Sequence, residues 1–286
     1  MQMKTITMKY LFDELSESAS ISITQKYSTS FSTAVKLLHS SIRQDIYNIY
    51  GFVRVADEIV DSFLGFSQKE LLDRFEDELW FGIKNQISTD TTINAFQTTV
   101  VKYSIPHSLI ISFLKSMRAD LTKSIYTNEE DINNYIYGSA DVVGLMCLMV
   151  FVNGNEEAFN SLKSSAVKLG SAFQKVNFLR DIKQDVEELN RTYFPNIDTD
   201  NFSESDKTRI IQEIEEDFAL AKEGIKLLPS SAKFGVYVAF KYYSKLLYKL
   251  KNTTSKDIKQ KRIRVSKLNK IYILVKSYIR FKLNVL

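Results

Sequence analysis

The sequence predicts an all-α protein that folds as a single domain over residues 1–286. The chain contains only nine Gly and three Pro, so few positions interrupt a helix. Apolar side chains recur at spacings of three and four residues, which is the period of a helix that buries one face. The scarcity of Gly and Pro also argues against a multi-stranded sheet. No linker, repeat or low-complexity block marks a domain boundary.

The first half of the chain is expected to form a helix, a short break and further helices. The Ser and Thr residues at 27–32 favour helix N-caps, whose outward backbone N–H groups suit an anion such as phosphate. Segment 129–152 begins polar and becomes almost wholly apolar, with small residues in its middle where another backbone or a ligand comes close. The expected helices are 10–38 with the break, 40–63, 68–84, 91–103, 108–126 and 129–152.

Residues 40–63 form the clearest expected helix, because two stripes with helical spacing run along them. The apolar stripe suits the core and consists of Ile42, Ile46, Ile49, Val53, Ala56 and Val60. The second stripe is charged and aromatic and consists of Arg43, Tyr47, Tyr50, Arg54, Asp57 and Asp61. Such a mixture is unusual on a wet surface. It suits the wall of a cavity that is apolar at one end and ionic at the other.

The second half of the chain is divided by two prolines. Pro195 stops the helix expected over 156–190, and Pro229 separates the next two. A polar loop is expected over 196–205 and a basic connector over 256–264. The remaining expected helices are 206–228, 230–251 and 265–282. The last of these is amphipathic, and its apolar side consists of Leu268, Ile271, Tyr272, Val275, Tyr278 and Ile279.

The composition excludes several classes of protein. Cys147 is the single cysteine, which rules out a disulfide framework and a Cys-based zinc site, and two histidines make a His-rich metal site improbable. The longest apolar run, 142–152, is too short to span a bilayer. The start of the chain lacks the apolar core of a signal peptide. These features predict a soluble, cytoplasmic protein, and no feature but the basic tail favours a nucleic-acid partner.

Positive charge is concentrated near the end of the chain, although the formal net charge is only +4. Residues 249–282 contain twelve Lys or Arg and one acid, Asp257. A solvated basic face is the simplest interpretation. The alternatives are a diphosphate contact and peripheral binding to an anionic membrane, where apolar substrates and products partition, at its inner face.

Two pairs of aspartates, each four residues apart, lie on two of the expected helices. Asp57 and Asp61 form the first pair, with Arg54 one turn upstream. The face that carries the second pair consists of Gln174, Asn177, Asp181 and Asp185. Like charges at this spacing cost a helix roughly 0.2–0.5 kcal/mol, which a wet surface tolerates and a bound cation offsets. Because Mg²⁺ is commonly held by one or two carboxylates plus phosphate, the repeated pair favours Mg²⁺ ions bridging to a substrate diphosphate.

These motifs resemble those of the squalene/phytoene synthase family. Residues 50–61 resemble its first aspartate-rich motif, and residues 176–185, followed by Arg191-x-Tyr193-Phe194, resemble the second. Residues 135–144 resemble the Tyr/Gly/Ala segment between them, and residues 28–31 resemble the N-terminal Ser/Phe turn. The order is that of the family over roughly 27–194. Tyr27 and Glu58 depart from it, since some relatives carry His and many carry Asp at these positions.

The resemblance implies an isoprenoid-synthase helical fold around a central active-site cavity, and it implies roles for particular residues. The catalytic residues it implies are Tyr50, Arg54, Tyr135, Arg180 and Tyr193. The diphosphate-binding residues are Ser28, Ser30, Arg54, Gln174, Asn177, Arg180 and Arg191. The metal ligands are Asp57, Asp61, Asn177, Asp181 and Asp185. Carboxylates hold Mg²⁺, arginines bind phosphate oxygens in a bidentate way, and tyrosine rings face a carbocation.

The reaction implied by the resemblance joins two prenyl diphosphates head to head through a cyclopropyl diphosphate. We expect two geranylgeranyl diphosphates to give phytoene, for carotenoid biosynthesis, without NADPH. A squalene or dehydrosqualene synthase acting on two farnesyl diphosphates is the enzymatic alternative, and a non-catalytic assembly factor is the non-enzymatic one. The expected cofactor is Mg²⁺ in several copies, for which Mn²⁺ can substitute, and the expected state is a monomer.

Overall fold

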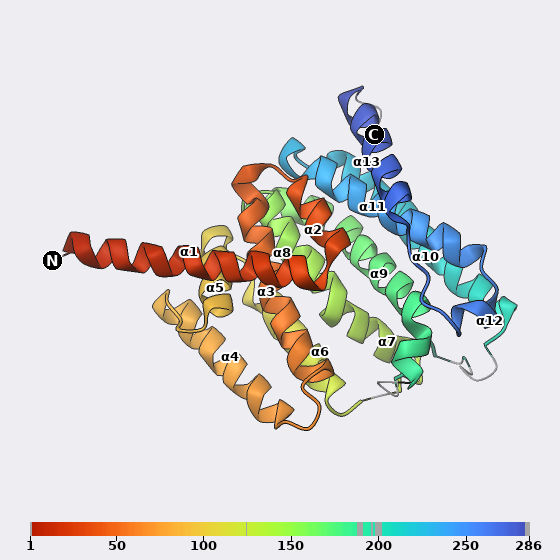
Figure 1. Cartoon of the computed structure of the whole chain (residues 1–286), viewed down its shortest axis with the longest axis horizontal. Helices are drawn as coiled ribbons and strands as arrows, with labels where there is room; N and C mark the ends of the chain where they lie inside the picture. Colours follow the sequence, from red (N-terminus) through yellow and green to blue (C-terminus); the bar gives the residue numbers. More distant parts are fainter. Residues whose placement is uncertain (1, 124, 188–190, 196, 198–201, 284–286) are drawn as a thin grey trace.

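The described part of the chain is helical and contains no β-strand (Figure 1). The computed structural model describes residues 2–123, 125–187, 191–195, 197 and 202–283. The all-α prediction is confirmed. The helices of the first half are α1 (Gln2–Tyr27), α2 (Thr29–Lys36), α3 (Ser40–Asp61), α4 (Gln68–Asn85), α5 (Thr91–Tyr103), α6 (His107–Asp120), α7 (Glu129–Ile136) and α8 (Val142–Phe151). Those of the second half are α9 (Glu156–Glu187), α10 (Glu204–Leu227), α11 (Ser230–Lys251), α12 (Ser255–Ile258) and α13 (Lys267–Lys282).

Most predicted helix boundaries agree with the structure within a few residues, and the larger differences have local causes. The break expected at 27–32 is confined to Ser28, whose side chain accepts a hydrogen bond from the Phe31 N–H and caps α2. Helix α6 ends at Asp120, earlier than the expected 126, because the chain turns there to place Tyr126 beside Thr192. The basic connector contains the short helix α12. The last three residues of the expected helix 156–190, and half of the expected loop 196–205, lie outside the described residues.

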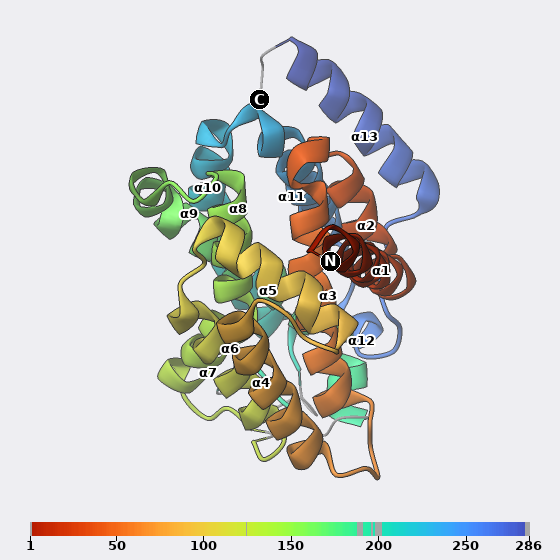
Figure 2. The same ribbon diagram turned by 90° about the vertical axis from the view of Figure 1, so that its left-hand side faces the viewer.

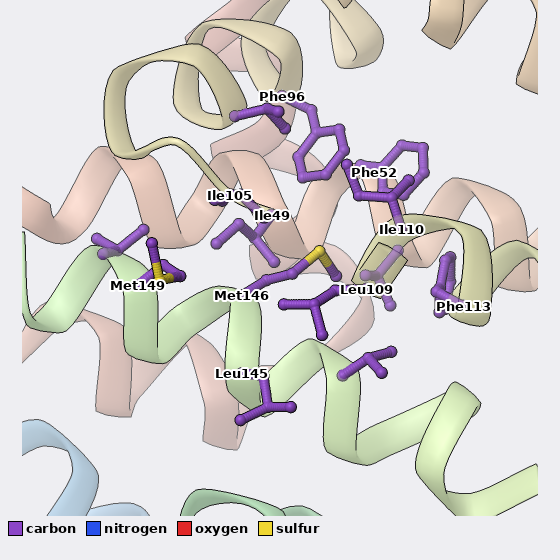
Figure 3. Close-up of a cluster of buried hydrophobic side chains, with 14 of the residues drawn as sticks. Ile49, Phe52, Phe96, Ile105, Leu109, Ile110, Phe113, Leu145, Met146 and Met149 are labelled. Carbon is purple, nitrogen blue, oxygen red and sulfur yellow. The ribbon is translucent and has the colours of Figure 1, made fainter. Parts of the chain in front are cut away.

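Two hydrophobic cores hold the helices together. The first surrounds α3 and α8, where Phe52 stacks against Phe96 with ring centroids 4.1 Å apart (Figure 3). The second joins α9 to α10, α11 and α12. In Figure 1 α9 runs between the helices of the first core and the pair α10 and α11, and both α8 and α10 pack against it. The fold therefore places the helices of the two aspartate motifs, α3 and α9, on either side of the space between the cores.

One stretch, Glu129–Phe151, is long and apolar enough to cross a bilayer by length and composition alone. It is longer than the apolar run 142–152 seen in the sequence because α7, a π-helical turn (η1, Tyr137–Asp141) and α8 follow one another without a break. More than half of its most apolar window is buried inside the protein. In this structure the stretch is a core element, and its π turn places Ser139 and Ala140 beside the cavity described below and Gly138 against α6.

Replacing Gly138 with Ala should lower the free energy of unfolding by about 1–3 kcal/mol, the usual cost of overpacking. A Cβ on Gly138 would lie only 2.7 Å from the Ser112 carbonyl oxygen of α6, so the helices must separate. Gly144 provides the matched control, because a Cβ there would meet nothing closer than 3.5 Å and Ala is the better helix former. Urea unfolding of both variants measures the difference. Equal stabilities would show that the contact between α6 and the π turn is not tight.

Candidate active site

A cavity of about 920 Å³ lies between the two cores. Its walls come from α2, α3, η1, α8, α9, α10 and α11, from the segment that leads into α13 and from the first turn of α13. Apolar side chains such as Val35, Leu148 and Phe151 line one part of the cavity. Polar side chains line another, and they include Ser28, Ser30, Tyr50, Arg54, Asp57, Gln174, Asn177, Arg180, Arg262, Arg264, Lys267 and Lys270. The expected cavity with an apolar end and an ionic end is therefore present.

The first motif lies on the face of α3 that meets the cavity. Phe31 of α2 stacks on the Tyr50 ring with centroids 4.6 Å apart. Arg54 forms an ion pair with Glu58 and lies 3.7 Å from Asp57. The Tyr27 ring covers the Arg54 guanidinium at 4.5 Å. Tyr27, for which the sequence motifs predicted no role, thus helps to fix the direction of Arg54.

The second motif lies on α9, and basic side chains from two parts of the chain meet it. Arg180 donates to Asp181 through Nε at 2.9 Å, and Arg262 donates to the same carboxylate at 2.8 Å. The Asn177 amide oxygen accepts a hydrogen bond from the Tyr243 hydroxyl of α11 at 3.3 Å. Arg262 belongs to the basic connector that the sequence left with three interpretations. Here it contacts the second motif directly.

Arg191 connects the two motifs. Its backbone N–H donates to the Asp185 carbonyl at 2.8 Å, so the chain folds back against the end of α9. Its guanidinium donates to Asp61 at 2.7 Å and to the Asp120 carbonyl at 3.0 Å. The residue is only 6% exposed, so little water competes for these contacts. Arg191 therefore ties α3, α6 and α9 together behind the cavity, in addition to the diphosphate contact that the resemblance implies.

Tyr135 and Tyr193 lie in an aromatic cluster with Tyr126 and Phe178. Phe178 and Tyr193 stack with centroids 4.0 Å apart, and the Tyr135 hydroxyl donates to the Asp120 carboxylate at 3.0 Å. Burial raises the pKa of Tyr135, and the charge of Asp120 raises it further. A neutral hydroxyl that donates to a buried carboxylate is held in one direction. The cluster gives Tyr135 and Tyr193 a fixed geometry beside Arg191.

Negative charge is crowded around both motifs. Desolvation raises the pKa of Asp57 to about 7, and the Asp61 carboxylate adds to this shift while Arg54 opposes it. Burial and then the charge of Asp181 raise the pKa of Asp185 to about 7. A nearby cation stabilises the charged form of a carboxyl group that burial and neighbouring carboxylates disfavour. The surroundings of both aspartate pairs therefore favour the approach of positive charge.

Within the part of the chain that the structure describes, no three His, Cys, Asp or Glu side chains converge closely enough to hold a metal ion by themselves. Mg²⁺ usually takes one or two carboxylates from a protein and completes its shell with waters and phosphate oxygens. The five candidate ligands from the sequence lie on α3 and α9, of which Asp57 and Asn177 reach the cavity wall. Their role as ligands stays a prediction.

Sequence reasoning missed residues whose neighbours come from distant parts of the chain. The Asp120 side chain is 3% exposed and accepts a hydrogen bond from Tyr135, but Asp120 stands alone in an ordinary amphipathic segment. Lys270 donates to the Ser30 hydroxyl at 2.6 Å across a sequence separation of 240 residues. Tyr243 reaches Asn177 from α11. No short motif contains these residues, and the only signal was the unusual density of Lys and Arg near the end of the chain.

Stability should fall as pH rises from about 4 to 7, and Asp141 should contribute to the fall. Burial raises the pKa of this carboxyl to about 7. The single Ser171 hydroxyl donates to it and lies 2.9 and 3.0 Å from its two oxygens. Its folded-state pKa is above the unfolded value of 3.8, so the native state binds the extra proton in this window and loses stability as that proton leaves. Asp141→Asn should therefore flatten the decline between pH 5 and pH 8 in urea unfolding. A variant that keeps the wild-type slope would show that Asp141 titrates normally.

Comparison with known proteins decides the family. The squalene/phytoene synthase profile matches residues 24–269, which is most of the chain. The chain belongs to the squalene/phytoene synthase family. It is 29% identical over 271 residues to chloroplastic phytoene synthase 1 of Solanum lycopersicum, covering 88% of this chain and 65% of that protein. It is 28% identical over 249 residues to 15-cis-phytoene synthase of Synechocystis sp., covering 79% of this chain and 73% of that one.

Solved structures agree with the squalene/phytoene synthase fold. The crystal structure of a dehydrosqualene synthase in complex with a ligand superposes with a TM-score of 0.81 at 22% sequence identity. The match covers 94% of this chain and 98% of that one. At this identity the likeness shows the fold alone, and it confirms the isoprenoid-synthase fold expected from the motifs. The family resemblance inferred from the sequence is likewise confirmed.

Proposed function

We propose that this chain condenses two molecules of geranylgeranyl diphosphate head to head to give phytoene, the carotenoid precursor. The observation that carries the proposal is the cavity, whose apolar part and ring of hydroxyl and basic groups match a diphosphate attached to a long prenyl chain. Its volume of about 920 Å³ is near the upper end of the range of about 300–1,000 Å³ for ligand pockets. Phytoene synthases from a plant and a cyanobacterium among its relatives support the same choice.

Residues in different parts of the cavity would have different roles in the first half-reaction. Arg54 and Arg180 bind phosphate oxygens as the C–O bond of the first substrate breaks and the allylic cation forms. The double bond of the second molecule attacks that cation, which gives a cyclopropyl diphosphate and releases a proton. The apolar walls near Leu148 and Phe151 exclude water, which would otherwise quench the cation. Tyr50 presents its ring toward the reacting carbons, held by its stack on Phe31.

The second half-reaction ionises the cyclopropyl diphosphate, rearranges the carbon skeleton and loses a further proton. Both diphosphates and both protons are then accounted for, and no reductant is consumed on the route to phytoene. Bound Mg²⁺ would neutralise the charge that grows on each departing diphosphate. Asp57 and Asp61 on α3 and Asp181 and Asp185 on α9 are the side chains that would hold it, together with Asn177.

A squalene or dehydrosqualene synthase that uses two farnesyl diphosphates is the second candidate. The observation that favours it is the superposition on a dehydrosqualene synthase, which covers nearly the whole of both chains. The mechanism and the site residues would be shared, and the two candidates differ in the length of prenyl chain that the cavity accepts. A non-catalytic assembly factor is the third reading. The presence of all four motif aspartates argues against it.

Product analysis tests the proposal directly. The purified protein is incubated with Mg²⁺ and, separately, with the C15 and C20 prenyl diphosphates, each with and without NADPH, and the hydrocarbon is identified. We expect a C40 triene from the C20 substrate without NADPH. A C30 product would overturn the proposed substrate and establish the second candidate. The absence of a product from either substrate would favour the non-catalytic reading.

A further inference from the structure

Helix α13 carries a broad apolar face that the rest of the described chain leaves uncovered. Leu268 is 79% exposed, and the other members of this face are also more than half exposed. The exposed apolar residues are Leu268, Ile271, Tyr272, Val275, Tyr278, Ile279 and Leu283. Within α13 the buried residue is Ser277, on the opposite side. The amphipathic pattern that the sequence predicted is present, but its apolar side points away from the core.

The side of α13 that carries Ser277 and Phe281 faces the protein and fixes the orientation of the helix. Phe281 packs against Phe234 of α11 with ring centroids 5.1 Å apart, and the Tyr242 hydroxyl donates to the Lys270 carbonyl at 3.3 Å. Both views show α13 along the outer edge of the molecule beyond α11 (Figures 1 and 2). The apolar face is therefore held outward by contacts on its other side.

The charge on α13 is all of one sign. The helix contains no acid, and its charged residues are Lys267, Lys270, Lys276, Arg280 and Lys282. Lys276 and Lys282 are exposed and lie beside the apolar face, where their ammonium groups approach the rings of Tyr272 and Tyr278. An apolar face bordered by lysines is the pattern of a helix that lies in the plane of an anionic membrane surface.

The first turn of α13 is also part of the cavity. Lys267 and Lys270 line it together with Arg262 and Arg264 of the preceding segment, and Lys270 contacts Ser30 on the opposite wall. The exposed apolar face thus begins where the polar part of the cavity ends. A molecule with an apolar chain and a diphosphate would meet α13 and the basic cavity lining in succession.

We propose that α13 docks this protein on an anionic phospholipid bilayer and holds the basic side of the cavity at the lipid surface. The charge pattern favours lipid over a second copy of the chain as the occupant. In a two-fold symmetric pair the same face meets itself, so the lysines of one α13 would lie near those of the other with no acid between them. Anionic headgroups supply the missing negative charge. Docking does not depend on which hydrocarbon the enzyme makes.

Vesicle flotation tests whether the protein binds lipid. The full chain is mixed with vesicles of phosphatidylcholine alone or with phosphatidylglycerol added, at low and high salt. We expect binding to the anionic vesicles, and we expect salt to weaken it because salt screens the lysines. Lys276→Gln and Lys282→Gln should each weaken it roughly fivefold. No binding to anionic vesicles at low salt would overturn the proposal.

A tryptophan reporter tests which surface makes the contact. Trp80 on α4 is the single native tryptophan, so Tyr272→Trp adds one reporter on α13. Lipids brominated in the acyl chain should quench the emission of the new tryptophan and leave that of Trp80 unchanged. Equal quenching of both, or quenching of Trp80 alone, would show that a different surface meets the lipid.

The triple variant Ile271→Asn, Val275→Asn, Ile279→Asn tests the apolar face itself. It should weaken binding at least about tenfold, while turnover of substrate dispersed in detergent stays at the wild-type level. The matched control is Leu220→Asn with Leu227→Asn, which removes two exposed apolar side chains from α10. Unchanged vesicle binding by the triple variant would contradict the proposal. The proposal would also be contradicted if sedimentation showed that the wild type is a dimer and that the triple variant is a monomer.

Discussion

Replacing Asp181 with Asn should lower turnover of prenyl diphosphate by roughly 10²–10³-fold at saturating Mg²⁺. Two arginines, Arg180 and Arg262, hold this carboxylate from α9 and from the basic connector, at 2.9 and 2.8 Å. The amide keeps the shape of the side chain and removes its charge. The site would then hold Mg²⁺ more weakly, and departure of diphosphate would lose the charge neutralisation that makes it fast.

Asp77→Asn on α4 is the matched control, because it removes the charge of an exposed aspartate on a helix outside the cavity lining. A second readout separates binding from chemistry. Mg²⁺ with inorganic diphosphate should raise the melting temperature of the wild type, and should raise that of Asp181→Asn much less, because a ligand stabilises the state that binds it. Turnover and thermal shift that both match the wild type would remove Asp181 from the metal site.

Replacing Arg191 with Ala should lower the free energy of unfolding by about 3–5 kcal/mol, because it leaves buried carboxylate charge unpaired. Arg191 is held against Asp61 at 2.7 Å and lies 3.8 Å from the Asp120 carboxylate. Asp120 has one carboxylate oxygen that is buried without a hydrogen-bond partner, so it depends strongly on the nearby positive charge. The guanidinium also donates to the Asp120 backbone carbonyl, which joins the segment that contains Arg191 to the end of α6.

The loss should be larger at pH 8 than at pH 5.5. Burial raises the pKa of Asp120 to about 7, and the charge of Arg191 opposes that shift. Without Arg191 the folded-state pKa rises further above the unfolded value, so the stability lost by deprotonation increases with pH through this window. At pH 5.5 Asp120 is largely protonated in the native state, and removal of Arg191 leaves less unpaired charge.

A double-mutant cycle checks the cause. Asp120→Asn in the Arg191→Ala background should restore part of the lost stability, with a coupling energy of about 0.5–3 kcal/mol. Arg209→Ala on the exposed side of α10 is the control, and it should change stability by less than about 0.5 kcal/mol. Urea unfolding at the two pH values measures all four variants. A coupling energy of zero would show that Arg191 acts through packing instead of charge.

The helices and the two aspartate motifs could be predicted because each is encoded by residues close together in the chain. Asp57 and Asp61 share a face of α3 by helical spacing alone, and Asp181 and Asp185 share a face of α9 in the same way. The charged and aromatic stripe on residues 40–63 predicted that Tyr50, Arg54 and Asp57 form part of a cavity wall. These residues do line the cavity. Residues spaced three or four apart share one face of any α-helix, so this spacing predicts which side chains lie together whatever the helix packs against.

The partners of these side chains depend on packing between distant helices. Arg191 reaches Asp61 across 130 residues, and Arg262 reaches Asp181 across 81. No local pattern encodes such pairs, since they depend on how α3, α6 and α9 cross. The sequence by itself therefore determined the fold class, the family and the faces that carry the chemistry. Only the tertiary structure decided that Asp120 and Tyr135 are buried together and that the apolar side of α13 points outward, because the direction of a helix face depends on what packs against the opposite side.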